Sequence, residues 1–139
     1  MTTHDHHPNH AGFTLIELLT TLMIISVLVM CSYPIYTNYI LKTRRIQAEV
    51  ALLDLASGLE QYHLLHQTYM NATLVDVQIN QYTDTQLYRL EIGSTTETSY
   101  ILKAYPMQIQ QADQLCGILS LNYLGQKMIS GSGKVSDCW

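Results

Sequence analysis

One apolar run constrains this chain more than any other feature of its sequence. Residues 13–41 are 29 residues with a single charged side chain, Glu17. A helix of about 20 apolar residues covers the ~30 Å hydrocarbon core of a bilayer. The alternative is a buried helix inside a soluble domain, which would need far more surrounding protein than a chain of 139 residues supplies. The run therefore predicts a helix that crosses a membrane.

Composition and the position of the run narrow the class of protein further. Charged residues make up 13% of the chain and the net charge is −4, which gives no electrostatic reason to expect a nucleic-acid protein. A secretory signal peptide has an apolar core of about 7–15 residues followed by a small-residue cleavage site. This run is longer and no such site follows it. The only abrupt change in composition comes before the run, between Gly12 and Phe13.

The motif at that boundary is Gly12-Phe13-Thr14-Leu15-Ile16-Glu17. It resembles the prepilin signature of type IV pilins and pseudopilins, in which a membrane-embedded aspartyl peptidase cuts after the glycine and methylates the new amino terminus. The resemblance implies that residues 1–12 are a leader and that Phe13 is the N-methylated first residue of the mature protein. It also implies that residues 13–36 form a transmembrane helix that later becomes part of the filament core.

The resemblance extends to Pro34, because pilins commonly have a proline at this distance from the cleavage site. Proline removes one helix hydrogen bond and crowds the preceding turn. We therefore expect a kink or a local opening near residues 30–34, at a position that matters for assembly.

Glu17 is the chemically unusual residue of the apolar run. A charged side chain in a bilayer helix costs roughly 2.5 kcal/mol or more, so it normally has a partner. Cleavage would create one, the α-ammonium group of Phe13, which lies four residues away on the same helix face. In a filament we expect the ammonium of one subunit to pair with the Glu17 carboxylate of its neighbour. The alternative is an interaction with the helix dipole alone, a term too small to offset burial.

After the apolar run the pattern changes to an amphipathic helix over residues 37–66. Helix followed by strands predicts an α+β fold. In residues 67–139 an irregular connection precedes three alternating segments, which predict strands over residues 86–92, 99–105 and 117–124. With the resemblance, this is the pilin fold: a long N-terminal helix packed on a small antiparallel sheet of three to four strands, with a C-terminal disulfide loop. The apolar stripe of the helix is expected at Ala48, Leu52, Leu55, Leu59 and Tyr62.

The C-terminal part, residues 113–139, resembles the end of a pilin subgroup with a disulfide-bonded loop. The resemblance implies a bridge between Cys116 and Cys138, which have 21 residues between them. That spacing matches neither a redox Cys-x-x-Cys pair nor a zinc motif. Lys127 and Lys134 both fall inside the loop and are the candidate contacts to DNA. Residues 67–139 as a whole contain four basic and six acidic side chains, so the basic footprint is local at most.

The sequence contains no catalytic arrangement. It has no Gly-rich phosphate loop, no nucleophile motif and no paired metal-ligand motif. The histidines at positions 4, 6, 7 and 10 lie in a short leader, and His63 and His66 have no third ligand. We therefore expect a structural protein, not an enzyme, without a cofactor or a metal.

The resemblance implies a major or minor subunit of a type IV pilus that serves adhesion, twitching motility or DNA uptake. Its partners would be other pilin subunits, the prepilin peptidase and the inner-membrane pilus assembly machinery. It would reside in the bacterial inner membrane before assembly and in the cell-surface pilus afterwards. Two alternatives stay open. One is a pseudopilin of a type II secretion system, and the other is a DNA-binding competence pilin, for which Lys127 and Lys134 are the support.

Overall fold

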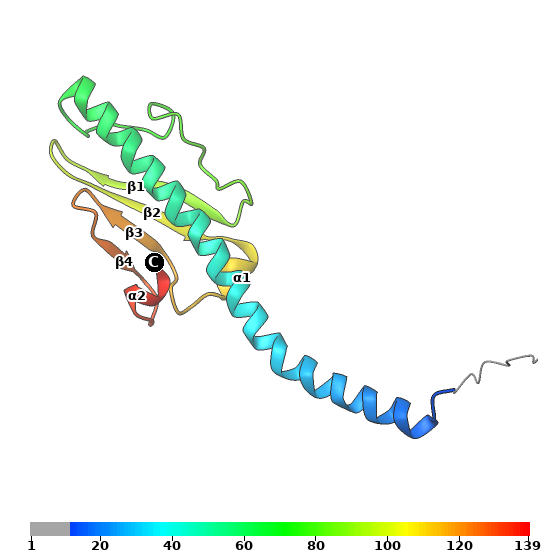
Figure 1. Cartoon of the computed structure of the whole chain (residues 1–139). Coiled ribbons are helices and arrows are strands. Elements are labelled where there is room, and N and C mark those ends of the chain that lie inside the picture. The colour runs from blue at the N-terminus through cyan, green and yellow to red at the C-terminus, as the bar shows by residue number, and fades with distance from the viewer. Residues whose placement is uncertain (1–11) are drawn as a thin grey trace, which may run out of the picture. The chain divides into compact units, whose positions relative to one another are not determined.

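The computed structural model describes residues 12–139, except for the side chains of Cys31 and residues 33–35. The predicted leader lies outside the described residues apart from Gly12, as does the side chain of Pro34. The chain divides into two compact units between Thr37 and Asn38. In chain order the elements are α1 (Leu15–His66), β1 (Tyr88–Thr95), β2 (Tyr100–Pro106), the 3₁₀ helix η1 (Gln108–Ala112), β3 (Leu119–Asn122), β4 (Lys127–Ile129) and α2 (Val135–Cys138) (Figure 1).

Helix α1 begins and ends where local hydrogen bonds favour it. At its start, the Thr14 hydroxyl accepts a hydrogen bond from the backbone N–H of Glu17, as an N-cap residue does. At its end, Gln67 has a positive φ of 57° and its N–H donates to the carbonyl of His63. The described backbone is helical throughout α1, so the local opening expected near Pro34 is not seen in it. A proline removes one hydrogen bond, and a long helix can continue past that loss.

The N-terminal unit exposes its apolar side chains. Every large apolar side chain from Leu15 to Met30 is between 53% and 79% exposed. Across the residues whose placement is described, no helix combines the length and the apolar character needed to cross a membrane. The transmembrane helix predicted over residues 13–36 is therefore not confirmed by the structure.

The globular unit, residues 38–139, has two layers. The second half of α1 lies across one face of a four-stranded antiparallel sheet with the strand order β1-β2-β3-β4 (Figure 1). The α+β prediction and the apolar stripe of the helix are confirmed, because four stripe residues are fully buried and the fifth, Tyr62, packs against them. The helix and the sheet share one core, formed mainly by Ala48, Leu52, Leu55, Leu59, Leu90, Leu102, Leu119 and Leu121.

The strands follow the predicted order with shifted limits. β1 extends three residues past the predicted limit at residue 92, because its pairing with β2 continues to the Thr95–Tyr100 pair. β4 is a short edge strand that pairs with β3 from Leu119–Ile129 to Leu121–Lys127. β4, η1 and α2 were not predicted, because their three to five residues lie in no longer segment with a periodic pattern, whereas β3 lies within the alternating segment 117–124.

Candidate functional site

Two of the three residues predicted to control assembly, Phe13 and Glu17, lie near the start of the described part of the chain. Phe13 precedes α1 and its side chain is 80% exposed. Glu17 lies in the first turn of α1, where a carboxylate interacts favourably with the helix dipole. Within the described part of the chain, the Glu17 carboxylate forms no hydrogen bond or ion pair.

The predicted disulfide is present in the C-terminal loop. Cys116 and Cys138 are bonded, with their Cα atoms 5.5 Å apart, and both are buried. The loop returns close to the chain ahead of Cys116, where the N–H groups of Gly131 and Gly133 donate to the carbonyls of Cys116 and Leu115 at 3.1 and 2.8 Å. A Cβ atom at position 131 would overlap the Leu115 carbonyl. Glycine is therefore needed where these two segments meet.

Lys127 and Lys134 both lie in this loop, in different elements. Lys127 begins β4, and its Nζ is 5.1 Å from the centroid of the Trp139 ring, a cation–π distance. The indole N–H of Trp139 donates to the Met128 carbonyl at 3.2 Å, which fixes the ring against β4. Lys134 immediately precedes α2, and α2 packs against β4. Both lysines are exposed, and neither forms an ion pair with any described residue.

The basic side chains of β1 and β2 differ from these two lysines. Arg89 donates to the carboxylate of Glu91 at 3.0 Å, and its guanidinium carbon is 4.7 Å from the centroid of the Tyr105 ring. Lys103 is half-buried on β2, where its aliphatic part lies close to Gly93. The C-terminal loop therefore holds cations that are freer to meet an anion than those of β1 and β2.

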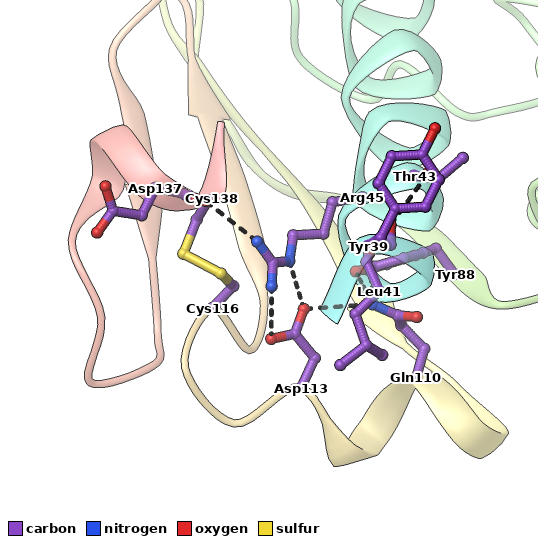
Figure 2. A network of polar contacts seen from close by, with 10 residues as sticks. All are labelled: Tyr39, Leu41, Thr43, Arg45, Tyr88, Gln110, Asp113, Cys116, Asp137 and Cys138. Atoms are coloured by element: carbon purple, nitrogen blue, oxygen red, sulfur yellow. Dashed lines mark hydrogen bonds and ion pairs between the residues drawn. A yellow bond between two sulfur atoms is a disulfide. The ribbon is translucent and has the colours of Figure 1, made fainter. Parts of the chain in front are cut away.

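A buried polar network joins α1 to the C-terminal loop (Figure 2). Arg45 donates from Nε and Nη2 to the two carboxylate oxygens of Asp113, at 2.5 and 3.2 Å, and from Nη1 to the Asp137 carbonyl at 3.1 Å. The Nε2 group of Gln110 donates to Asp113 at 3.2 Å and to the Tyr88 hydroxyl at 3.0 Å. Burial is the main cause that raises the pKa of Tyr88 to about 12, against the lowering effect of that hydrogen bond.

Sequence reasoning alone misses this network. Arg45 follows Lys42 and Arg44 and has the appearance of one more surface charge. The available signal is its spacing, because Arg45 precedes Ala48 by three residues and so continues the buried face of α1 toward the N-terminus. Its acidic partner, Asp113, carries no local signal that could identify it.

A second polar cluster lies near the C-terminal end of α1. Glu60 accepts hydrogen bonds from the hydroxyls of Tyr69 and Tyr100, at 2.9 and 3.0 Å. His63 and His66 each stack on a tyrosine ring, with centroids 4.3 and 4.2 Å apart. Among residues 12–139 with described side chains, no group of three His, Cys, Asp or Glu residues is arranged to hold a metal ion.

Comparison with known proteins adds two family matches. Residues 34–120 match the family described as "Type IV minor pilin ComP, DNA uptake sequence receptor", and residues 7–30 match the prokaryotic N-terminal methylation motif. A similar solved structure is that of the Neisseria meningitidis non-core minor pilin PilV, with a TM-score of 0.57 and 18% sequence identity, covering 70% of this chain and 93% of that one. At this identity the likeness shows the fold alone. No curated protein matches the chain.

Proposed function

The chain belongs to the family of the type IV minor pilin ComP, the DNA uptake sequence receptor, and we propose from this that its C-terminal loop binds DNA outside the cell. The observation that carries DNA binding is the family match, which spans more than half of the chain and most of its globular unit. The match ends at residue 120, so the placement of DNA binding in the C-terminal loop is supported by Lys127 and Lys134. Membership makes the chain a type IV pilus subunit and favours a pilus over a type II secretion pseudopilus. DNA uptake is the use of the pilus that we propose.

The support for DNA binding within the chain is local. Residues 38–139 contain seven basic and nine acidic side chains, so the unit as a whole does not attract a polyanion. Lys127 and Lys134 are exposed, lack ion pairs among the described residues and share one disulfide-closed loop. Each lysine can neutralise one DNA phosphate and release the counterions condensed on it. This release is the basis of sequence-independent affinity for DNA.

Fluorescence anisotropy of a labelled duplex, titrated with the globular unit over a range of salt concentrations, tests this proposal. The whole buried core lies within that unit. We expect binding at low salt that weakens as salt rises. In Lys127→Ala/Lys134→Ala the negative slope of log affinity against log salt should become shallower by about 1.8, because each lost phosphate contact removes roughly 0.9 from its magnitude.

The control variant is Lys103→Ala, which removes one positive charge from β2 and leaves the loop intact. It should change the affinity for DNA much less than Lys127→Ala/Lys134→Ala does. Absence of binding by the unaltered unit at low salt would refute the DNA-binding proposal. Equal affinity in the double variant would show that other residues make the contact.

For assembly, we propose that a prepilin peptidase removes residues 1–12 and that the methylated ammonium group of Phe13 pairs with Glu17 of a neighbouring subunit. The exposed apolar side chains of the N-terminal unit would then be covered by helices of other pilins. A contact of this head-to-tail kind does not close on itself and so builds a filament. Pro34 is the position at which we expect the helix to open when subunits pack.

The methylation motif at residues 7–30 supports this route, because proteins with that motif are held at the membrane before they reach the pilus surface. Passage through an inner-membrane assembly machinery is part of the same proposal.

A further inference from the structure

Arg45 touches both ends of the disulfide-closed loop (Figure 2). Its guanidinium group binds the carboxylate of Asp113, three residues before Cys116, and the carbonyl of Asp137, the residue before Cys138. These partners are 68 and 92 residues away from Arg45 in the chain. One side chain on α1 therefore holds the two segments that the disulfide also joins.

The C-terminal segment has few other anchors. Helix α2 contains only four residues, of which Cys138 alone is buried, and the Lys134 cap makes no side-chain hydrogen bond. A helix this short is unstable without tertiary contacts. Outside it, the Gly133 N–H donates to the carbonyl of Leu115, the residue before Cys116, and the indole of Trp139 donates to Met128 and packs against the core.

The disulfide and Arg45 thus differ in what they attach. The disulfide closes the loop on itself, between residues 116 and 138. β3, inside the loop, reaches the core through Leu119 and Leu121. Arg45 attaches the two ends of the loop to α1, through a planar fork that satisfies three acceptors in one geometry. A buried ion pair adds little net stability compared with apolar residues of the same size, so its main effect here is geometric.

We propose that Arg45 is a positioning residue that fixes the C-terminal segment of the disulfide-closed loop, residues 133–138, against α1. Without Arg45 the loop stays closed but its C-terminal segment separates from the helix. Lys127 is held by the pairing of β4 with β3. The consequence that Lys134 is thereby held in a DNA-binding arrangement with Lys127 rests on the proposed function.

The test uses the full-length chain in detergent micelles and measures amide hydrogen exchange. Arg45→Met would leave Asp113 buried without its partner and could unfold the unit. Arg45→Met/Asp113→Leu removes both charges and still deletes the contact to the Asp137 carbonyl. We expect the amides of Gly133, Asp137 and Trp139 to exchange about tenfold faster in this double variant, while those of Leu102 and Ala104 in β2 stay unchanged.

Two further variants sharpen the result. Arg45→Lys keeps the charge but loses the fork, so it should protect the same C-terminal amides only in part. Arg44→Met is the control, because Arg44 forms no hydrogen bond or ion pair with any described residue. It should leave exchange unchanged throughout.

Unchanged exchange at the C-terminal amides would overturn the proposal, because the disulfide would then suffice to position the loop. Equal acceleration in β2 would also overturn it, because Arg45 would then act only on overall stability.

DNA affinity of the same variants is measured in parallel. If the C-terminal amides exchange faster in the double variant but the unaltered chain binds no DNA, the positioning role is supported and the proposed function is refuted. Local release with unchanged DNA affinity refutes only the link to the lysines.

Discussion

The hydroxyl groups of Tyr69, Tyr88 and Tyr100 lie in surroundings that disfavour the phenolate. Burial is the first cause that raises the pKa of each one above the ordinary value of 10.0. The carboxylate of Glu60 raises the pKa of Tyr69 and Tyr100 further, because it accepts a hydrogen bond from each hydroxyl. The pKa of Tyr88 reaches about 12. These three residues therefore keep their protons in the folded chain when an unfolded chain begins to lose them.

This difference predicts how stability depends on alkaline pH. The pKa is higher in the folded state, so the tyrosines add no pH dependence below about pH 10, and stability falls as pH rises from there. Tyr100→Phe should make that fall less steep, since one titrating group is gone. It should also lower the free energy of unfolding at neutral pH by about 1 kcal/mol, through the lost hydrogen bond to Glu60.

Urea unfolding of the globular unit between pH 7 and pH 11 measures both effects. Tyr123→Phe is the control, because its side chain is exposed in the turn between β3 and β4. If Tyr100→Phe and the unaltered unit lose stability equally fast above pH 10, the buried hydroxyl does not account for the dependence.

At the scale of elements, the second half of α1 has a buried face and an exposed face. The buried face packs against the sheet, and the position of each leucine around the helix decides whether it belongs to that face. Leu52 has no exposed surface, whereas Leu53 is 52% exposed. Adjacent residues on a helix point about 100° apart, so the same side chain contributes very differently at these two positions.

Leu52→Ala should therefore lower the free energy of unfolding by about 2–5 kcal/mol, the range for a buried leucine that leaves a cavity. Leu53→Ala, the matched control, should change it by no more than about 0.5 kcal/mol. Both values come from chemical denaturation of the globular unit. Similar losses in the two variants would contradict the assignment of the buried face.

The elements that could be predicted are those that lie within a segment long enough to show a period. The apolar run, the amphipathic stripe and the first three strands repeat at spacings that a sequence displays directly. β4, η1 and α2 have three to five residues each and depend on contacts outside themselves. The disulfide was predicted through resemblance to pilins with such a loop, and the structure confirms it.

At the scale of the whole molecule, the exposed apolar side chains of the N-terminal unit and the lone carboxylate of Glu17 have to be accommodated by other molecules. An unpaired carboxylate covered by apolar helices would lose its hydration without compensation. A neighbour's Phe13 ammonium group would supply that compensation in a filament.

Glu17→Leu should therefore reduce the amount of the chain recovered in sheared pili, relative to the amount in the cells, because the pairing is lost. Glu97→Leu removes the same charge from the exposed turn after β1 and serves as the control. Mass spectrometry of the recovered protein should find a mature chain that begins at N-methylated Phe13. Normal recovery of Glu17→Leu would contradict the pairing.

The sequence by itself determined the long helix, its two chemically different halves, the order of helix and sheet, and the two cysteines of the loop. These features are local or periodic, so they can be read along the chain. Only the tertiary structure decided that Arg45 is buried and bound to Asp113 and Asp137. That contact joins residues 68 and 92 positions apart, and such a contact exists only once α1, η1 and the C-terminal loop have packed together.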